Sequence, residues 1–267
     1  KMDEAVKSKN LFFQKNGLWN SPNDKQFFII PGAVIKRNGH IYTQKDLKFK
    51  LEDFLEFMGY YISEGSFTRG KYPIKYKYHH NCIRYIISIS QKETSKATPK
   101  IEECLKNLGI HFKKRINNKN GMAIFWIQNK TLFEFVEKLG RSHEKYIPRE
   151  FLNYPKDKLK YLFEALIDGD GSRVGWTRYY TISYQLANNV QELALRLGYS
   201  GNIRSDKPKK NSKTLYNSKT LYTVSIIKDR NQPQIEFNKP NKNNSAYKKE
   251  IQYSGKVYCV SVPNHLI

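Results

Sequence analysis

The sequence predicts an α+β protein built from two pseudo-symmetric αββαββα repeats, and three observations support this prediction. The same order of helix-like and strand-like segments occurs twice along the chain. Each copy opens with an amphipathic helix that ends in Gly-Ser, at Gly65-Ser66 and at Gly171-Ser172. The strand-like runs are short and are separated by turn residues, which is typical of antiparallel sheets.

The first repeat is predicted to occupy residues 49–140, and it opens with a helix over 51–64 whose apolar residues recur at helical spacing. Two strands, a helix closed by Gly109, two more strands and a helix closed by Gly140 should follow. These six segments are expected at 66–76, 82–91, 94–108, 110–117, 122–129 and 131–139.

The second repeat is predicted over residues 157–235, after a linker at 141–156 that contains Pro148 and Pro155. A helix should again come first, followed by strands, a helix and two strands. These segments are expected at 157–170, 172–185, 187–197, 201–207 and 219–228. Two flanks remain, an N-terminal extension at 1–48 and a C-terminal tail at 236–267.

The charge of the chain favours a polyanion as partner. Among 267 residues, 47 are Lys or Arg and 24 are Asp or Glu, which gives a net charge of +23. An excess this large indicates a nucleic acid. Lys, Asn, Ile and Tyr are abundant together, so an A+T-rich genome could account for part of the lysine. Such a bias would not hold Asp and Glu so low.

Composition also excludes several classes of protein. Apolar residues make up 39% of the chain and charged residues 27%, as in globular proteins. Runs such as Phe27–Ile30 are too short to span a membrane, and no N-terminal stretch has the apolar core of a signal peptide. An intracellular location is expected, with cytoplasm, nucleoid and organelle left open. Three dispersed cysteines argue against a disulfide framework and against structural zinc.

Two carboxylates are predicted to meet at adjacent helix ends. Aligning the two Gly-Ser pairs places Glu64 on Asp170. The same alignment gives each helix two small residues four apart, Gly59 and Ser63 in one and Ala165 and Gly169 in the other. Small residues at this spacing let two helix backbones approach closely. Parallel helices packed in this way would bring both carboxylates together.

That arrangement predicts a divalent metal site. A helix C-terminus carries partial negative charge, so it disfavours a carboxylate, and two neighbouring carboxylates also repel each other. A bound cation would relieve these terms, and Mg²⁺ suits one or two carboxylates plus phosphate oxygens and water. Glu64 and Asp170 are therefore predicted metal ligands for phosphodiester hydrolysis, with backbone ligands unassigned.

The segments FMGYYISEG (57–65) and FEALIDGDG (163–171) resemble the paired LAGLIDADG motifs of homing endonucleases. The second copy is the closer match, and the first departs at Ile62, Ser63 and Glu64. The resemblance covers about 49–230 and includes Lys-x-Ile-Pro at 145–148. It implies a monomer in which two curved sheets form a saddle on double-stranded DNA, with both motif helices at the seam. It also implies cleavage of a long asymmetric target with Mg²⁺ or Mn²⁺, whereas Ca²⁺ would bind without supporting cleavage.

The resemblance adds four catalytic candidates. The family places a polar residue, often Gln, at the end of the second strand, and Gln91 and Gln185 resemble it. It also places a Lys at the end of the fourth strand, and Lys130 and Lys228 look like that residue. An amide can position a water, and a Lys can offset charge that grows on phosphate oxygens.

Strand alternation predicts which side chains face DNA. Around 110–116, one face carries His111, Lys113 and Arg115, while Arg84 and Ser88 face outward from the preceding strand. Arg and Lys favour guanine edges and Asn favours adenine, although many such residues only touch phosphates. The predicted DNA-binding residues are Ser66, Arg84, Ser88, His111, Lys113, Arg115, Arg178, Asn202 and Arg204.

The flanks resemble part of an intein, a protein-splicing element that often carries an endonuclease of this family as an insert. The segment VYCVSVPNH (257–265) is similar to a late splicing block, in which a His assists cleavage. Splicing also needs a nucleophile at the intein start and a terminal His-Asn pair, and neither is present. We therefore expect an intein-derived chain that does not splice.

Two other functions stay open at this point. The scaffold could serve as a catalytically inactive nucleic-acid binder, such as an RNA maturase or a transcription regulator. The chain could also be a splicing remnant with a structural role. Retention of both Glu64 and Asp170 favours cleavage, because acids near phosphates do not help binding.

Overall fold

The computed structural model describes residues 10–12, 19–21, 23–37, 39–71, 83–207, 219–229, 234–236, 252 and 254–256. The chain divides into two compact units, one made of Lys1–Gln14 with Gln232–Ile267 and the other of Lys15–Asn231. In the first unit, β1 (Asn10–Phe12) pairs antiparallel with β14 (Gln234–Glu236). The splicing-block resemblance at 257–265 lies outside the described residues.

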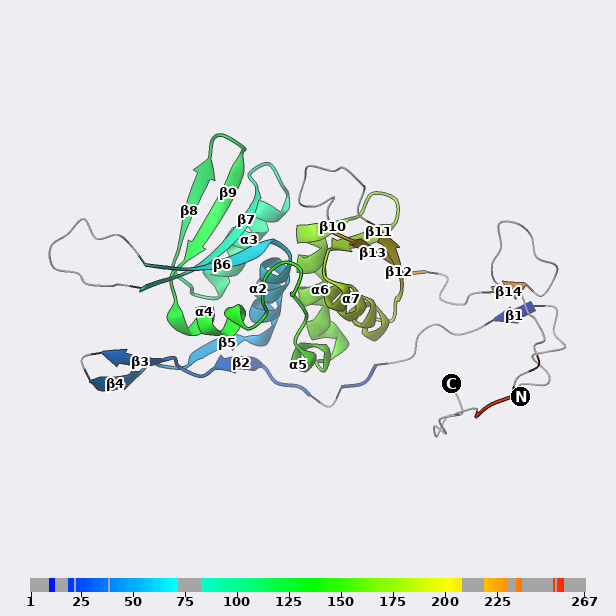
Figure 1. The fold of residues 1–267 in the computed structure, drawn as a ribbon, viewed down its shortest axis with the longest axis horizontal. Helices are drawn as coiled ribbons and strands as arrows, with labels where there is room; N and C mark the ends of the chain where they lie inside the picture. Colours follow the sequence, from blue (N-terminus) through cyan, green and yellow to red (C-terminus); the bar gives the residue numbers. More distant parts are fainter. Residues whose placement is uncertain are drawn as a thin grey trace. The chain divides into compact units, whose positions relative to one another are not determined.

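The first repeat forms as predicted in the second unit (Figure 1). Helix α2 (Leu51–Glu64) leads directly into an antiparallel sheet of order β6-β7-β9-β8. The strands are β6 (Gly65–Lys71), β7 (Ile83–Lys92), β8 (Phe112–Asn117) and β9 (Met122–Ile127). Helices α3 (Ala97–Asn107) and α4 (Lys130–Glu137) follow β7 and β9.

The second repeat has the same topology, which confirms the predicted fold class. Helix α6 (Lys156–Asp170) leads into an antiparallel sheet of order β10-β11-β13-β12. Its strands are β10 (Gly171–Ser172), β11 (Thr177–Thr181), β12 (Ser200–Asp206) and β13 (Leu221–Ile227). Helix α7 (Tyr184–Arg196) corresponds to α3, and the short α5 (Arg149–Leu152) lies in the predicted linker.

Two details of the second repeat differ from the prediction. The predicted repeat pattern ends in a closing helix, but none of the described residues after β13 (228–229, 234–236, 252 and 254–256) is helical. The strands expected over 172–185 also end early, at Thr181. Ser183 caps α7 instead, and its side chain accepts a hydrogen bond from the Leu186 amide.

The N-terminal strands belong to the same compact unit as the repeats, and this unit begins at Lys15. Strand β2 (Phe27–Ile30) pairs with β5 (Leu47–Lys50), and β3 (Val34–Arg37) pairs with β4 (His40–Thr43). The Phe28 ring stacks on Phe54 of α2 with 4.3 Å between centroids. This extension therefore completes the core around α2.

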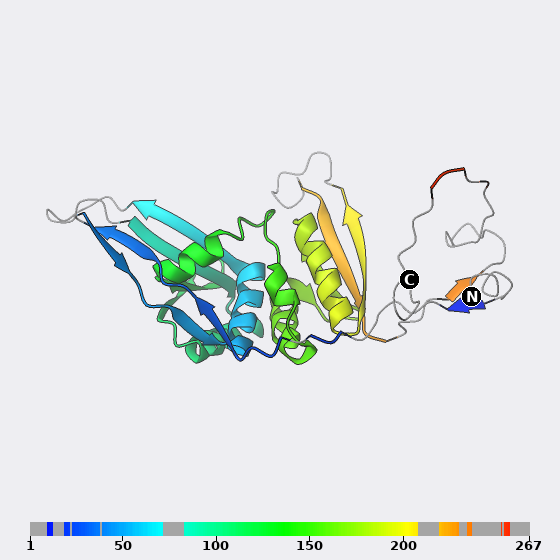
Figure 2. The same ribbon diagram turned by 90° about the horizontal axis from the view of Figure 1, so that it is seen from below.

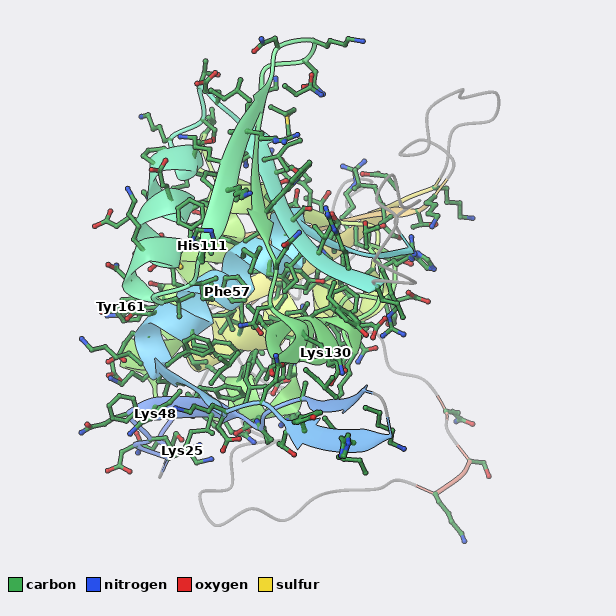
Figure 3. All side chains as sticks on the ribbon, turned by 90° about the vertical axis from the view of Figure 1, so that its left-hand side faces the viewer. Lys25, Lys48, Phe57, His111, Lys130 and Tyr161 are labelled. Atoms are coloured by element: carbon green, nitrogen blue, oxygen red, sulfur yellow. The ribbon has the colours of Figure 1, made fainter. Side chains whose placement is uncertain are left out.

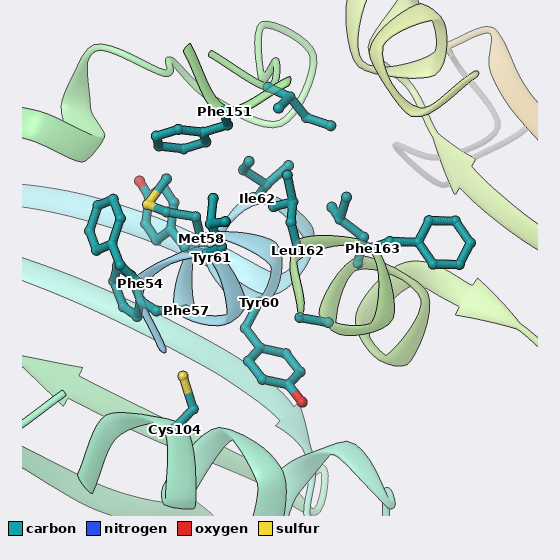
Figure 4. Packing of buried hydrophobic residues seen from close by; sticks show 14 of the residues in the cluster. Phe54, Phe57, Met58, Tyr60, Tyr61, Ile62, Cys104, Phe151, Leu162 and Phe163 are labelled. Carbon is teal, nitrogen blue, oxygen red and sulfur yellow. The ribbon is translucent and has the colours of Figure 1, made fainter. Parts of the chain in front are cut away.

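The helices α2 and α6 lie side by side between the two sheets (Figures 1 and 2). A β-carbon at Gly59 would come within 2.6 Å of the Ala165 β-carbon, and one at Gly169 within 2.5 Å of the Ser63 β-carbon. The helices run parallel, since the contact advances four residues on both. Figure 4 shows α2 side chains packed between α6 and α3.

Replacing Gly59 or Ala165 by Leu should force these helices apart. Overpacking of a core typically costs about 1–3 kcal/mol. We expect a lower melting temperature, and a larger loss in any activity that needs the two helix ends to converge. Thermal unfolding of both variants tests this, and unchanged melting would contradict the seam.

No helix among the described residues could cross a lipid bilayer, since none has the length and apolar character that this requires.

Candidate functional site

Glu64 and Asp170 are the last residues of α2 and α6, and the parallel seam brings them together. A β-carbon at Gly169 would lie 3.3 Å from Cγ of Glu64, so the Glu64 side chain lies against the last turn of α6. Ser63 also donates a hydrogen bond to the Leu166 carbonyl at 3.2 Å, which ties the two ends. The structure thus produces the convergence that the small residues predicted.

The ionised forms of both carboxylates are disfavoured in the folded protein. Burial raises the pKa of Glu64 above its usual value. The pKa of Asp170 is raised to about 7, first by burial and then by the charge of Glu64, while Lys145 opposes the shift. Two partly desolvated carboxylates therefore share one small volume, and a nearby cation would favour their ionised forms.

Lys145 supplies a cation that the motif analysis did not assign. Its side chain is buried at 4% exposure. Nζ donates hydrogen bonds to the carbonyls of Tyr61 at 2.9 Å, Ile62 at 2.8 Å and Gly65 at 2.7 Å. These contacts provide donors for carbonyl groups at the C-terminal end of α2, and they place a positive charge at the negative end of the helix dipole. Burial lowers the pKa of Lys145 to about 8, and the charges of Asp170 and Glu64 work in the opposite direction.

A sequence signal for Lys145 did exist. Neither α2 nor α6 has a basic residue in its last turn. A helix that ends in a carboxylate and lacks such a residue needs a cation from elsewhere in the chain. The Lys-x-Ile-Pro segment at 145–148 carried that cation, but we read it only as a linker.

The amide of Gln91 acts on Glu64 as the resemblance implied. Its Nε2 donates to Oε1 of Glu64 at 2.7 Å from the end of β7. In the second sheet the equivalent position is Thr181. Gln91 lies two residues after Ile89, the partner of Gly65, and Thr181 lies two residues after Tyr179, the partner of Gly171.

Gln185 is therefore misplaced by the prediction. It is exposed in the first turn of α7, because the Ser183 cap begins a helix where a strand was expected.

Lys130 and Lys228 are also placed away from the carboxylates. Ala123 pairs with Gln91 at the beginning of β9, whereas Lys130 follows the other end of that strand. Its Nζ donates to the Val34 carbonyl at 2.6 Å and lies 3.3 Å from Glu134 (Figure 3).

The same relation holds in the second sheet. Tyr222 pairs with Thr181, and Lys228 follows the far end of β13, 5.5 Å from the Tyr199 ring centroid. The sequence correctly indicated that each Lys follows the end of a strand. It did not indicate that this end of the strand points away from the carboxylates.

A cavity of about 260 Å³ lies beside Asp170. Lys145, Thr181 and Lys219 contribute to its lining, together with Ser63. The Glu64 carboxylate instead has the amide of Gln91 as a hydrogen-bond donor. The two halves of the site therefore differ chemically, although their backbones repeat.

Most of the predicted DNA-binding residues share the outer faces of the two sheets. Ser66 pairs with Ser88, and Arg84 alternates with buried Ile87 and Ile89 along β7. The other outward positions follow from the same ladders and comprise Lys113, Arg115, Arg178, Asn202 and Arg204. His111 is exposed but precedes β8, outside the ladder. Each half thus presents a face with basic side chains beside the carboxylate pair.

The carboxylate pair suits a divalent cation. The described residues contain no group of three or more His, Cys, Asp or Glu that could enclose a metal ion. Mg²⁺ does not need such a cage, because it usually takes one or two protein carboxylates plus substrate phosphates and waters. Burial raises the pKa values of both carboxyl groups, so a bound cation would favour their ionised forms.

Two parallel helices thus bring a carboxylate pair together between two matching antiparallel sheets. Residues 157–235 match the family model described as the LAGLIDADG-like domain. One curated relative, the "DNA-directed RNA polymerase subunit beta C-terminal section" of Stigeoclonium helveticum, is 26% identical over 295 residues. That match covers 94% of this chain and 25% of the relative, so the chain spans about a quarter of the relative's length.

Similar solved structures include I-DmoI in complex with DNA and Mn, with a TM-score of 0.46 and 15% identity over 66% of this chain and 89% of that one. The N-terminal LAGLIDADG domain of DUF199/WhiA gives 0.42 and 10% identity, covering 67% of this chain and 75% of that one. The I-LtrWI LAGLIDADG homing endonuclease bound to target DNA gives 0.40 and 12% identity, covering 66% and 79%.

Proposed function

We propose that this chain is a sequence-specific, Mg²⁺-dependent endonuclease that cuts both strands of a long asymmetric DNA target as a monomer. The observation that carries the proposal is the convergence of Glu64 and Asp170 at the α2/α6 seam, between two sheets with basic outer faces. A net charge of +23 supports DNA as the partner. The match of 157–235 to the LAGLIDADG-like domain supports the same class.

Each residue near the pair has a role in this proposal. Glu64 and Asp170 would hold Mg²⁺ or Mn²⁺, which would supply charge stabilisation at the phosphate and activation of a water for attack. Gln91 fixes the orientation of the Glu64 carboxylate through its 2.7 Å hydrogen bond. Lys145 favours the ionised carboxylates and so keeps them available as ligands. The outer faces of the sheets hold the duplex across the seam.

A plasmid assay tests the proposal. Supercoiled plasmids that carry a randomised insert are incubated with the full chain in Mg²⁺, in Ca²⁺ and in EDTA. We expect linear product from a minority of the plasmids in Mg²⁺ alone. Binding without linear product in every metal would favour the inactive nucleic-acid binder, and linear product in EDTA would contradict the metal-dependent mechanism.

The paired flanks favour a second proposal, that the endonuclease unit is carried within a larger element. Strands β1 and β14 come from opposite ends of the chain, yet they pair in a unit separate from 15–231. The curated relative is likewise matched along only 25% of its length. Residues 15–231 alone should then retain cleavage. A truncated chain that folds but no longer cuts would show that the flanks belong to the endonuclease.

A further inference from the structure

We propose that Trp126 is a positioning residue that orients Arg115, so that the first sheet reads a guanine in its half of the target more strictly than the second sheet reads the equivalent position. The inference rests on the proposed function, since it needs DNA on the outer faces of the sheets. Arg115 alone was a candidate from the sequence, and Trp126 was not.

The contact lies on the outer face of the first sheet. Cζ of Arg115 lies 4.6 Å from the centroid of the Trp126 ring. Trp126 pairs with Lys113 and Arg115 pairs with Ile124, so the two side chains are diagonal neighbours across β8 and β9. Trp126 alternates with buried Phe125 and Ile127 along β9. Figure 1 shows β8 and β9 as adjacent strands at the edge of this sheet.

A ring contact of this kind leaves the recognition chemistry of Arg115 intact. A guanidinium over an indole face is attracted by the ring electrons, and this does not occupy its N–H donors. Those donors match the O6 and N7 acceptors of guanine in the major groove. A side chain already restricted before binding loses less conformational freedom when it docks. Trp126 therefore favours a bidentate contact between Arg115 and one base.

The second sheet provides an internal comparison at the same register. Ile89 and Tyr179 are equivalent, and following the ladders from them places Arg204 on Arg115 and Ser225 on Trp126. Among the described residues, the diagonal neighbour of Arg204 is therefore Ser225 rather than an indole.

The guanidinium of Arg204 contacts a carboxylate instead. Its Nε donates to Oδ1 of Asp206 at 3.0 Å, and its NH2 group lies 2.9 Å from the same oxygen. This contact occupies donors that a guanine would need. Within the described part of the chain, no carboxylate forms an ion pair with Arg115. The two arginines thus occupy equivalent positions, but before DNA binds the guanidinium of Arg115 lies on an aromatic ring and that of Arg204 is paired with a carboxylate.

Competition binding with the full chain in EDTA tests the inference. The probe is the target selected by wild type, compared with its variants that carry each other base at every position. Arg115→Ala should lose roughly 5- to 150-fold in discrimination at one base pair of the first half-site. Trp126→Leu should lose discrimination at that same base pair, and Trp126→Phe should lose less because it keeps a ring. Adding Trp126→Leu to Arg115→Ala should cause little further loss.

Arg115→Lys and Asp206→Asn are the companion variants. Both are surface changes that should leave folding intact, which keeps the test informative if Trp126→Leu unfolds. Arg115→Lys keeps the charge and loses the planar fork, so affinity for the selected target should fall towards the affinity for its variants at that base pair. Asp206→Asn should sharpen discrimination at the matching position of the second half-site.

Uniform weakening by Trp126→Leu across all sequences, or effects of Trp126 and Arg115 at different base pairs, would overturn the inference. If the wild-type protein prefers one sequence and Arg115→Lys keeps that preference unchanged, the inference about Trp126 and Arg115 is overturned, while the proposed function stands. A wild type without any sequence preference would overturn the proposed function as well.

Discussion

Replacing Glu64 by Gln or Asp170 by Asn should abolish double-strand cleavage while DNA binding stays intact or tightens. Each change removes one of the two converging carboxylates and keeps nearly the same shape. Under the proposed mechanism each variant loses a metal ligand, so the rate should fall by at least about 10²-fold. Binding should not suffer, because a negative charge near the phosphates is removed.

Cleavage of a plasmid that carries the selected target measures this, together with a mobility-shift titration. Asp168→Asn is the matched control: Asp168 lies two residues from Asp170 on the same helix but contacts Lys100 at 2.6 Å. We expect the control to cut normally. Near wild-type cutting of both strands by Glu64→Gln or Asp170→Asn would show that the carboxylate pair is not the site.

The stability of Asp170→Asn separates loss of chemistry from loss of fold. The pKa of Asp170 is raised from 3.8 to about 7, so the folded protein holds this proton more tightly than the unfolded chain does. Without metal, wild-type stability should therefore fall as pH rises from about 4 to about 7. Asp170→Asn should remove that fall and be the more stable protein at pH 8, by up to about 4 kcal/mol. Thermal melts of both proteins at pH 4 and pH 8 in EDTA measure this difference in stability. A variant that melts below wild type at pH 8 would contradict the prediction.

Replacing Lys145 by Met should damage both stability and cleavage. The change leaves three carbonyls at the end of α2 without their donor and leaves Glu64 and Asp170 without a neighbouring cation. Removing one partner from a buried charged cluster costs about 3–5 kcal/mol. The cost should shrink in an Asp170→Asn background, because less negative charge is then uncompensated.

Chemical denaturation of the two single variants and the double variant measures this coupling. Lys130→Met and Lys228→Met serve as controls, since both residues follow the strand ends far from the carboxylates. We expect these controls to cut DNA. Additive costs for Lys145→Met and Asp170→Asn would contradict the electrostatic link between the residues.

The sequence carried much of the fold because its signals were local and repeated. Gly59, Ser63, Ala165 and Gly169 marked the seam, and the Gly-Ser pairs marked both helix ends. The predicted alternation along β7 also holds. These features depend on spacing within one element, which a sequence displays directly.

The site was harder to predict wherever it depends on distant partners. Gln185 read as the end of a strand, but the hydrogen bond between Ser183 and Leu186 starts a helix there. Strand β9 runs antiparallel to β7, so Lys130 follows the end of β9 that lies away from Glu64. No local sequence pattern encodes that relative direction. Lys145 reaches α2 from a segment 80 residues or more away in sequence. Burial of this kind becomes visible only when the chain is folded.

Sequencing of both cleaved ends from the randomised plasmid library tests the central claim most directly. The claim is that two unequal repeats read one target and cut it at their seam. It predicts a single asymmetric site, cut in both strands near its centre, in which the half contacted by the first sheet is the more strictly conserved among the cleaved molecules. The outer faces differ as this requires, with Lys113 and Arg115 in one sheet and Asn202 and Arg204 in the other. A palindromic site, or breaks without sequence preference, would contradict the claim.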